Sequence, residues 1–195
     1  KATLSAISQI KKIDVCIHAA SLNAADLAVK DPIKYHGNNV VGLMNLLQCI
    51  GAFGCKRVVF SSSSLVYGKG AKSPISEDAP VGRGVTNAYA RGKVFCEQIL
   101  DDHCAGPEGR AWGVTSLRFG VVSGCHPSGR LGEDGTVAPI QNTLKDVVKV
   151  ALGKTEALPL CGTDYSTPDG TAVRDYIHVM DAAEAHVLAA KKLLA

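Results

Sequence analysis

Short apolar runs of strand type alternate with helical segments in the first part of the chain, and this alternation limits the possible folds more than any other feature. The strand-like runs cover residues 13–18, 57–60 and 112–119, and apolar residues recur with helical spacing over 38–50 and 88–102. Strands that alternate with helices form right-handed βαβ units with parallel strands. The sequence therefore predicts an α/β fold built on a parallel sheet.

After Val122 the sequence becomes richer in glycine and polar residues. Turn-rich segments here flank a helical pattern, and a strand and a second helix follow. In order, these segments are 123–135 (turns), 140–152 (helix), 159–170 (turns), 174–179 (strand) and 182–194 (helix). Asp181 is expected to be the N-cap of the last helix.

Tyr89 and Lys93 form the motif with the clearest chemical meaning. Because they are four residues apart on a predicted helix, they share one face, and the Lys93 ammonium can approach the Tyr89 phenol. A nearby cation favours the phenolate, so we expect Lys93 to lower the pKa of Tyr89 and make it a base near neutral pH. The spacing alone is common, and an exposed helix pair is the simpler interpretation.

A run of four serines, Ser61–Ser64, follows the apolar strand 57–60. Ligands of open α/β sheets bind beyond the carboxyl ends of the strands, which is where these hydroxyl groups are expected. A serine beside Tyr89 would bind the same substrate oxygen. Together these groups suit the removal of a proton from an alcohol whose carbon gives up a hydride.

Composition excludes several classes of partner. The 195 residues carry a net charge of +3 with no basic stripe, so we expect no nucleic-acid partner. No apolar run approaches the roughly 20 residues that span a bilayer. The seven cysteines are odd in number and lack metal-ligand spacing, which predicts reduced thiols in a cytoplasmic protein without a metal site.

Beyond the Ser/Tyr/Lys set, several segments resemble the extended short-chain dehydrogenase/reductase family, and within it the UDP-glucose 4-epimerase branch. The segments that match only this branch are Cys125–Gly129 (Cys-His-Pro-Ser-Gly) and Val173–Asp181 (Val-Arg-Asp-Tyr-Ile-His-Val-Met-Asp). The other matching segments are His18–Ala20, Asn38–Val40, Phe60–Gly68, Tyr89–Lys93 and Gly132–Asp134.

The resemblance implies the middle of a longer fold. Its parts are a partial Rossmann-like doubly wound parallel sheet that binds NAD (1–122), part of a smaller substrate-binding domain (123–172), and a strand and helix that return to the first domain (173–195). The glycine-rich turn that cradles the pyrophosphate in such folds is absent from the sequence. We therefore expect these 195 residues alone to bind NAD poorly.

The resemblance also implies a reaction, the reversible inversion of C4 in a UDP-hexose with bound NAD. Tyr89 would take the proton of the 4-hydroxyl, Lys93 would hold the tyrosine pKa down and bind the nicotinamide ribose, and Ser63 matches the catalytic serine. Ser64 takes that role if the register is shifted by one. A dehydratase would be expected to have a threonine and an acidic pair here, and that pattern is absent.

Further binding residues follow from the same resemblance. Asn38 or Asn39 matches a cofactor-side asparagine, with a helix N-cap as the alternative, and Ser61 is also placed at the cofactor. Asn142 matches a nucleotide-sugar contact, with an exposed helix face as the alternative. Arg174 matches the arginine that grips the UDP diphosphate, a task that suits a guanidinium, with a surface ion pair to Asp175 as the alternative.

Three positions depart from the family pattern: Asn23 stands where a lysine is usual, Val121 where an asparagine is usual, and Cys161 where an aromatic residue is usual. Each change weakens the expected nucleotide-sugar site. Two alternatives therefore stay open: another nucleotide-sugar enzyme, such as a dehydratase, reductase or decarboxylase, or a non-catalytic relative that binds nucleotide or a protein. The family usually pairs through helices that include the tyrosine-bearing one, so a homodimer is expected.

Overall fold

The computed structural model describes residues 12–107, 109–133 and 143–195. It divides into two units, one formed by Lys1–Phe119 with Glu184–Ala195 and the other by Gly120–Ala183. The division into three regions made from the sequence stays a prediction.

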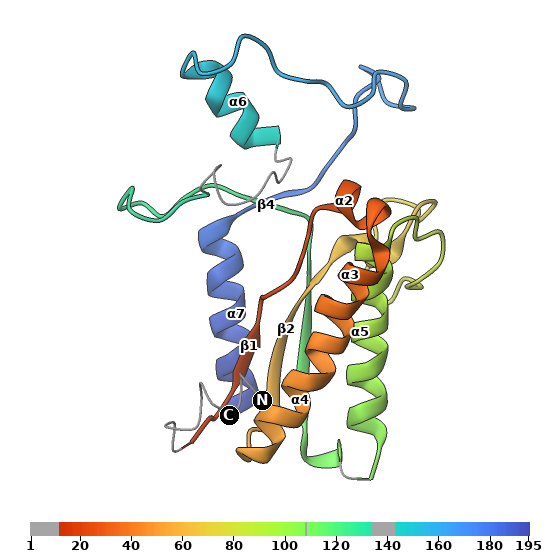
Figure 1. The fold of residues 1–195 in the computed structure, drawn as a ribbon, viewed down its shortest axis with the longest axis vertical. Coiled ribbons are helices and arrows are strands. Elements are labelled where there is room, and N and C mark those ends of the chain that lie inside the picture. The colour runs from red at the N-terminus through yellow and green to blue at the C-terminus, as the bar shows by residue number, and fades with distance from the viewer. Residues whose placement is uncertain (1–11, 108, 134–142) are drawn as a thin grey trace. The chain divides into compact units, whose positions relative to one another are not determined.

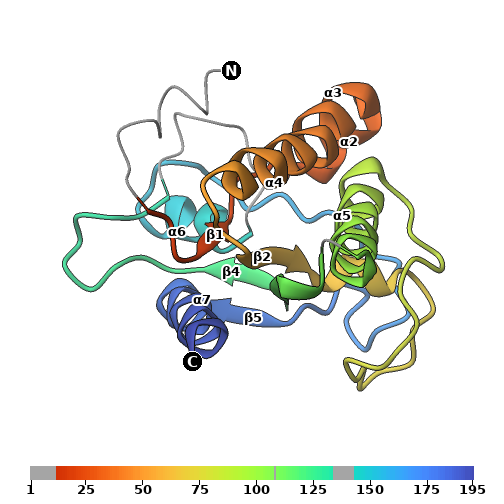
Figure 2. The same ribbon diagram turned by 90° about the horizontal axis from the view of Figure 1, so that it is seen from below.

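The first unit contains a parallel sheet with the strand order β1-β2-β3 and helices on both faces. In Figure 2, α4 and α5 lie on one side of β2 and α7 lies on the other. The elements are β1 (Cys16–His18), α2 (Ala25–Lys30), α3 (Pro32–His36), the π-helical turn η1 (Gly37–Val41), α4 (Gly42–Ala52), β2 (Arg57–Ser63), the 3₁₀ turn η2 (Ser64–Tyr67), α5 (Ala88–Ala105), the 3₁₀ turn η3 (Gly109–Ala111), β3 (Gly113–Phe119) and the last part of α7 (Val179–Leu194). The predicted α/β class and parallel sheet are confirmed.

The core of this unit lies between β2 and the pair α4 and α5. It combines the apolar face of α4 with alternate residues of β2 and two residues of α5, all nearly inaccessible to solvent. The cluster contains Leu43, Leu47, Ile50, Cys55, Val58, Phe60, Cys96 and Leu100. Asn87 caps the start of α5, because its Oδ1 accepts a hydrogen bond of 2.8 Å from Ala90 N. The core and cap together fix the face that α5 presents to the end of β2.

The second unit contains a two-stranded parallel ladder and one further helix. Strand β4 (Val121–Ser123) pairs with β5 (Tyr176–His178), and α6 (Thr143–Ala151) follows the loop after β4. At Gly124, which has a φ of +105°, an added Cβ would meet the His178 ring, so glycine allows the chain to pass close to β5. Figure 1 labels β4 and α6, and Figure 2 also labels β5.

Two local predictions need correction. Asp181 lies inside the first turn of α7, which begins at Val179, so it is not the N-cap of that helix. Helices α2 and α3, of six and five residues, were not predicted because neither is long enough to show a helical apolar period. No helix among the described residues is long and apolar enough to cross a membrane.

Candidate active site

Strand β2 ends at the serine run, and α5 lies against this carboxyl end. Ser61, Ser62 and Ser63 are the last residues of the strand, and the side chains of the last two are buried. Lys93 of α5 is only 4% exposed, and its Nζ donates a hydrogen bond of 2.7 Å to the Ser61 carbonyl oxygen. The predicted meeting of the serine run with the Tyr/Lys helix is therefore present at the expected end of the sheet.

Tyr89 and Ser63 are joined by a hydrogen bond between their side chains, and this bond lowers the Tyr89 pKa. Burial has the larger effect and raises the pKa of Tyr89 above its ordinary value. Lys93 Nζ lies 5.7 Å from the centre of the Tyr89 ring. The expected lowering of the Tyr89 pKa is thus wrong for the chain by itself, because burial of the phenol outweighs its hydrogen bond with Ser63.

Lys93 itself is strongly perturbed. Burial lowers its pKa from 10.5 to about 8, against smaller raising effects of Cys96 and Glu97. The ammonium also lies 4.8 Å from the centre of the Phe60 ring, a distance that suits a cation–π contact. At neutral pH the site therefore holds a positive charge that has little solvent around it.

Asn39 and Asn38 lie inside η1, so neither is a helix N-cap. Asn39 is buried and ties η1 to the segment after β1: its Oδ1 accepts from Leu22 N and its Nδ2 donates to Leu22 O, both at 2.9 Å. Asn38 is exposed and donates to Asn39 Oδ1. Asn39 thus fixes the loop that leaves the carboxyl end of β1.

The remaining predicted binding residues belong to the second unit. Arg174 is exposed, and its Nη1 donates a hydrogen bond of 2.9 Å to Val173 O. Asn142 lies outside the described residues. Of the three departures, Asn23 in the first unit and Cys161 are exposed, and Val121 is half-buried in β4. No group of three metal-ligating side chains occurs among the described residues.

Sequence reasoning missed an ion pair beside the serine run. Glu97 is 5% exposed and accepts a hydrogen bond from Ser62 Oγ. Arg118 of β3 donates to the same carboxylate, with 2.8 Å between Arg118 Nη2 and Glu97 Oε2. The sequence did indicate that Glu97 lies near the site, because Glu97 follows Lys93 by four residues and therefore shares its helix face.

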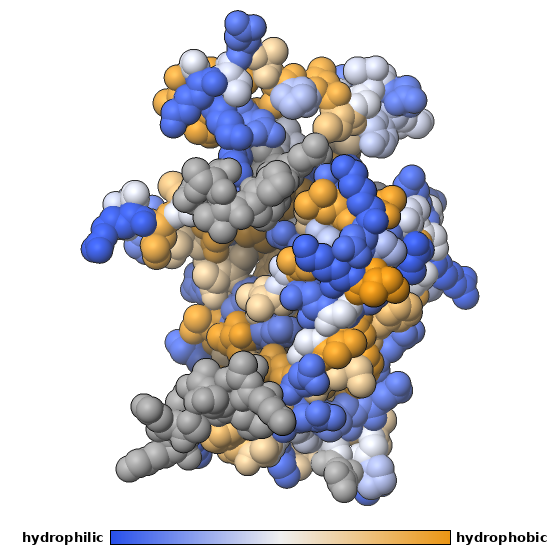
Figure 3. All heavy atoms as spheres, in the orientation of Figure 1, coloured by the Kyte–Doolittle hydropathy of each residue, from blue (hydrophilic) through white to orange (hydrophobic). Residues whose placement is uncertain are grey.

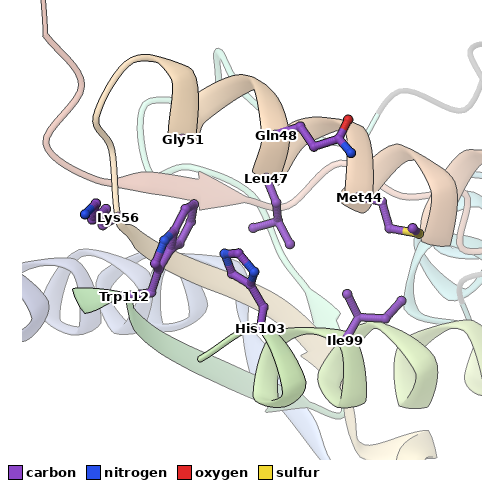
Figure 4. A pocket seen from close by; sticks show the side chains of 8 residues that line it. All are labelled: Met44, Leu47, Gln48, Gly51, Lys56, Ile99, His103 and Trp112. Atoms are coloured by element: carbon purple, nitrogen blue, oxygen red, sulfur yellow. The ribbon is translucent and has the colours of Figure 1, made fainter. Parts of the chain in front are cut away.

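A hollow of about 670 Å³ between α4 and α5 lies at the other end of the sheet (Figure 4). It is lined by Met44, Leu47, Gln48, Gly51, Lys56, Ile99, His103 and Trp112. Lys56 immediately precedes the first residue of β2, so the hollow is at the amino ends of the strands and is separate from the candidate site.

Comparisons with known proteins agree on one family. The model of the NAD dependent epimerase/dehydratase family matches residues 1–194. The chain is 47% identical over 184 residues to UDP-glucose 4-epimerase of Bacillus subtilis, and 44% identical over 183 residues to UDP-glucose 4-epimerase 2 of Arabidopsis thaliana. These alignments cover 94% and 93% of this chain, but only 52% and 51% of the relatives.

Solved structures lead to the same group. UDP-glucose 4-epimerase from Bifidobacterium longum, solved in complex with NAD+ and UDP, superposes with a TM-score of 0.86 at 42% identity, over 95% of this chain and 54% of that one. The enzyme from Stenotrophomonas maltophila, solved with NAD and formylated UDP-arabinopyranose, gives a TM-score of 0.87 at 36% identity, over 97% of this chain and 55% of that one. The chain thus spans about half the length of these relatives.

Proposed function

This chain belongs to the NAD dependent epimerase/dehydratase family, and from that membership we propose that the full-length protein interconverts UDP-glucose and UDP-galactose by inverting C4. The observation that carries the proposal is the hydrogen-bonded pair Tyr89 and Ser63 beside the buried cation of Lys93. The names of the relatives, UDP-glucose 4-epimerases at 44–47% identity, support the choice of substrate.

In the proposed reaction, the 4-hydroxyl of the sugar binds between Ser63 Oγ and Tyr89 Oη. Tyr89 takes the hydroxyl proton as C4 loses its hydrogen, and a 4-keto sugar forms. Bound NAD would supply the acceptor for the C4 hydride, the donor that returns this hydride to the other face of the 4-keto sugar, and a positive charge. Tyr89 then gives the proton back to the oxygen at C4. Lys93 supplies a further positive charge that favours the phenolate for as long as it is protonated.

The residues around the site fit a dinucleotide. Ala19 and Ala20 are small and exposed, and they follow β1 at its carboxyl end, which leaves room above the neighbouring ends of β1 and β2. Lys93 is the proposed partner of the ribose, and Asn39 holds the adjoining loop through its two hydrogen bonds with Leu22. In the second unit, Arg174 is the proposed partner of the UDP diphosphate, since a guanidinium binds phosphate oxygens in pairs.

A coupled assay of the full-length protein tests the proposal. UDP-galactose and UDP-N-acetylgalactosamine are offered in separate reactions. UDP-glucose formed from the first is followed with a UDP-glucose dehydrogenase, and the products of both reactions are identified by NMR. We expect conversion of UDP-galactose. A folded, NAD-containing protein that releases water from the sugar would instead be a dehydratase, and one that turns over neither substrate would be a non-catalytic relative.

We also propose that the full-length protein is a homodimer that pairs through the outer face of α4 and α5. Three large apolar side chains of α4, α5 and the adjoining turn η1 are exposed, Met44 by 46%, Phe95 by 43% and Val41 by 49%. Figure 3 shows hydrophobic residues at the surface in the region of these helices, among hydrophilic ones. Burial of such side chains favours association.

We further propose that the protein is cytoplasmic, where reducing conditions would keep all seven cysteines free, as they are in this structure.

Phe95→Glu is expected to convert the dimer into a monomer at micromolar concentration, because the new carboxylate would be buried in the interface without a partner. Light scattering coupled to size exclusion gives the mass. Ile75→Glu is the matched control, since Ile75 is also 43% exposed but lies outside both helices. A wild-type monomer, or a Phe95→Glu dimer, would refute this arrangement.

A further inference from the structure

Glu97 continues the line of functional side chains on α5. Tyr89, Lys93 and Glu97 are spaced by four residues, so they lie on one helix face that is turned toward the serine run. Each of them contacts a different serine. Tyr89 bonds to the Ser63 side chain, Lys93 to the Ser61 carbonyl and Glu97 to the Ser62 hydroxyl.

Arg118 holds the Glu97 carboxylate in place from the neighbouring strand. Its Nε lies 3.1 Å from Glu97 Oε1 and its Nη2 lies 2.8 Å from Oε2, a two-pronged geometry that fixes the carboxylate plane. Arg118 Nη1 also donates to Tyr67 Oη at 2.9 Å and to the Glu77 carbonyl at 3.1 Å. The pair therefore joins β3, α5, η2 and the loop that follows η2.

Ser62, which Glu97 binds, lies between the serine that contacts Lys93 and the serine that contacts Tyr89. Ser62 is preceded by Ser61, whose carbonyl accepts from Lys93, and followed by Ser63, whose side chain bonds to Tyr89. Because these three residues form one continuous piece of β2, a bond that fixes Ser62 also limits the movement of its neighbours. Loss of that bond would loosen both contacts together.

Glu97 is also the negative charge that faces Lys93. The groups around the ammonium are Tyr89, Cys96 and Glu97 from α5, His18 from β1, and the Ser61 carbonyl and Phe60 ring from β2. Burial raises the pKa of Cys96 to about 11, so this thiol is neutral at physiological pH. The pKa of His18 is lowered by burial and by Lys93, so it adds little charge. Glu97 thus opposes the loss of the Lys93 proton.

We propose that Glu97 is a positioning residue of the catalytic set, which holds the serine run in register through Ser62 and keeps Lys93 protonated through its charge. This proposal rests on the proposed epimerase function. Arg118 serves the same purpose indirectly by orienting the Glu97 carboxylate.

Glu97→Gln in the full-length protein is the first test. We expect kcat to fall by about 100-fold, the scale that small displacements of catalytic groups produce, with KM changed by less than about 2-fold because Glu97 does not touch the sugar. The alkaline limb of the kcat profile should move to lower pH, because Lys93 loses its proton more readily without the carboxylate. An unchanged kcat and pH profile would overturn the proposal.

A double variant separates positioning from folding. Glu97→Met with Arg118→Met removes both charges, and such replacement of a buried ion pair is often neutral or stabilising. We expect the double variant to unfold near the wild-type temperature yet to remain as slow as Glu97→Gln. Recovery of kcat to within about 2-fold of wild type would show that the single variant suffers only from an unpaired Arg118, and would overturn the proposal.

A measurement that needs no turnover keeps this proposal distinct from the proposed function. The pKa of Lys93 can be followed by NMR of lysine labelled with ¹³C at Cε, with the signal assigned by its loss in Lys93→Arg. We expect a lower pKa in Glu97→Gln than in wild type, whether or not the protein is an epimerase. Equal Lys93 titration in both proteins would overturn the proposal, whereas a shifted titration in a protein without epimerase activity would refute only the function.

Discussion

Tyr89→Phe is expected to lower epimerase turnover of the full-length protein by about 10²–10⁴-fold, the usual contribution of a positioned acid–base group. The change removes one oxygen atom, and with it the proton acceptor for the 4-hydroxyl and the hydrogen bond to Ser63. The ring remains to pack beside Tyr35 and Ala88, so the fold and the cofactor site should persist. The loss should therefore fall on kcat.

The measurement compares kcat with the NAD content of the purified variant, released by denaturation and quantified by absorbance. Tyr165→Phe is the matched control, because it removes the same atom from a phenol that is 46% exposed in a loop of the second unit. It should leave kcat unchanged. Near wild-type epimerisation by Tyr89→Phe would refute the proposed role of Tyr89 as the proton acceptor. Loss of NAD along with activity would indicate a structural role of Tyr89.

Lys93→Met is expected to have two opposite effects. It should lower kcat by about 100-fold or more, because the phenolate loses its neighbouring cation. It should also make the cofactor-free protein more stable. The lowering of the Lys93 pKa from 10.5 to about 8 corresponds to a folding cost of about 3 kcal/mol at neutral pH. Part of this gain is offset because Ser61 O loses its donor, so we expect a net increase of about 1–2 kcal/mol.

The stability gain of Lys93→Met should depend on pH, because the buried Lys93 of the wild type releases its proton at a lower pH than an exposed lysine. Between about pH 8 and 10.5 the unfolded Lys93 holds its proton while the folded one has released it. The wild-type free energy of unfolding therefore rises with pH in this window, since the unfolded state binds more protons. The advantage of Lys93→Met should be full at pH 7 and nearly gone at pH 10.5. Urea unfolding of both proteins across this range measures it, and a less stable variant at pH 7 would contradict the account.

The sequence was sufficient to predict the features that depend on local pattern. The apolar runs of β2 and β3 and the helical period of α5 predicted the sheet and the helix that bring Tyr89, Ser63 and Lys93 together. The Arg118–Glu97 pair was not predictable in this way, because its members lie on different elements and meet only when α5 packs on β3.

The electrostatics of the site were also beyond the sequence. A cation four residues from a phenol suggested a lowered tyrosine pKa. The direction is the opposite in the structure because it depends on how deeply Tyr89 is buried, which tertiary packing decides. The N-cap alternative for Asn38 and Asn39 fails for a similar reason, since the π-helical turn places both inside a helix.

The fate of the hydrogen at C4 distinguishes hydride transfer to and from bound NAD from a route in which this hydrogen exchanges with water. UDP-galactose that carries deuterium at C4 is incubated with the full-length protein in ordinary water, and the UDP-glucose product is examined by mass spectrometry and NMR. Hydride transfer to and from bound NAD predicts UDP-glucose with the deuterium retained at C4, because the hydride leaves and returns within one closed site while only the hydroxyl proton passes through Tyr89. Product that has lost the deuterium to solvent, or no product from a folded protein that contains NAD, would contradict it.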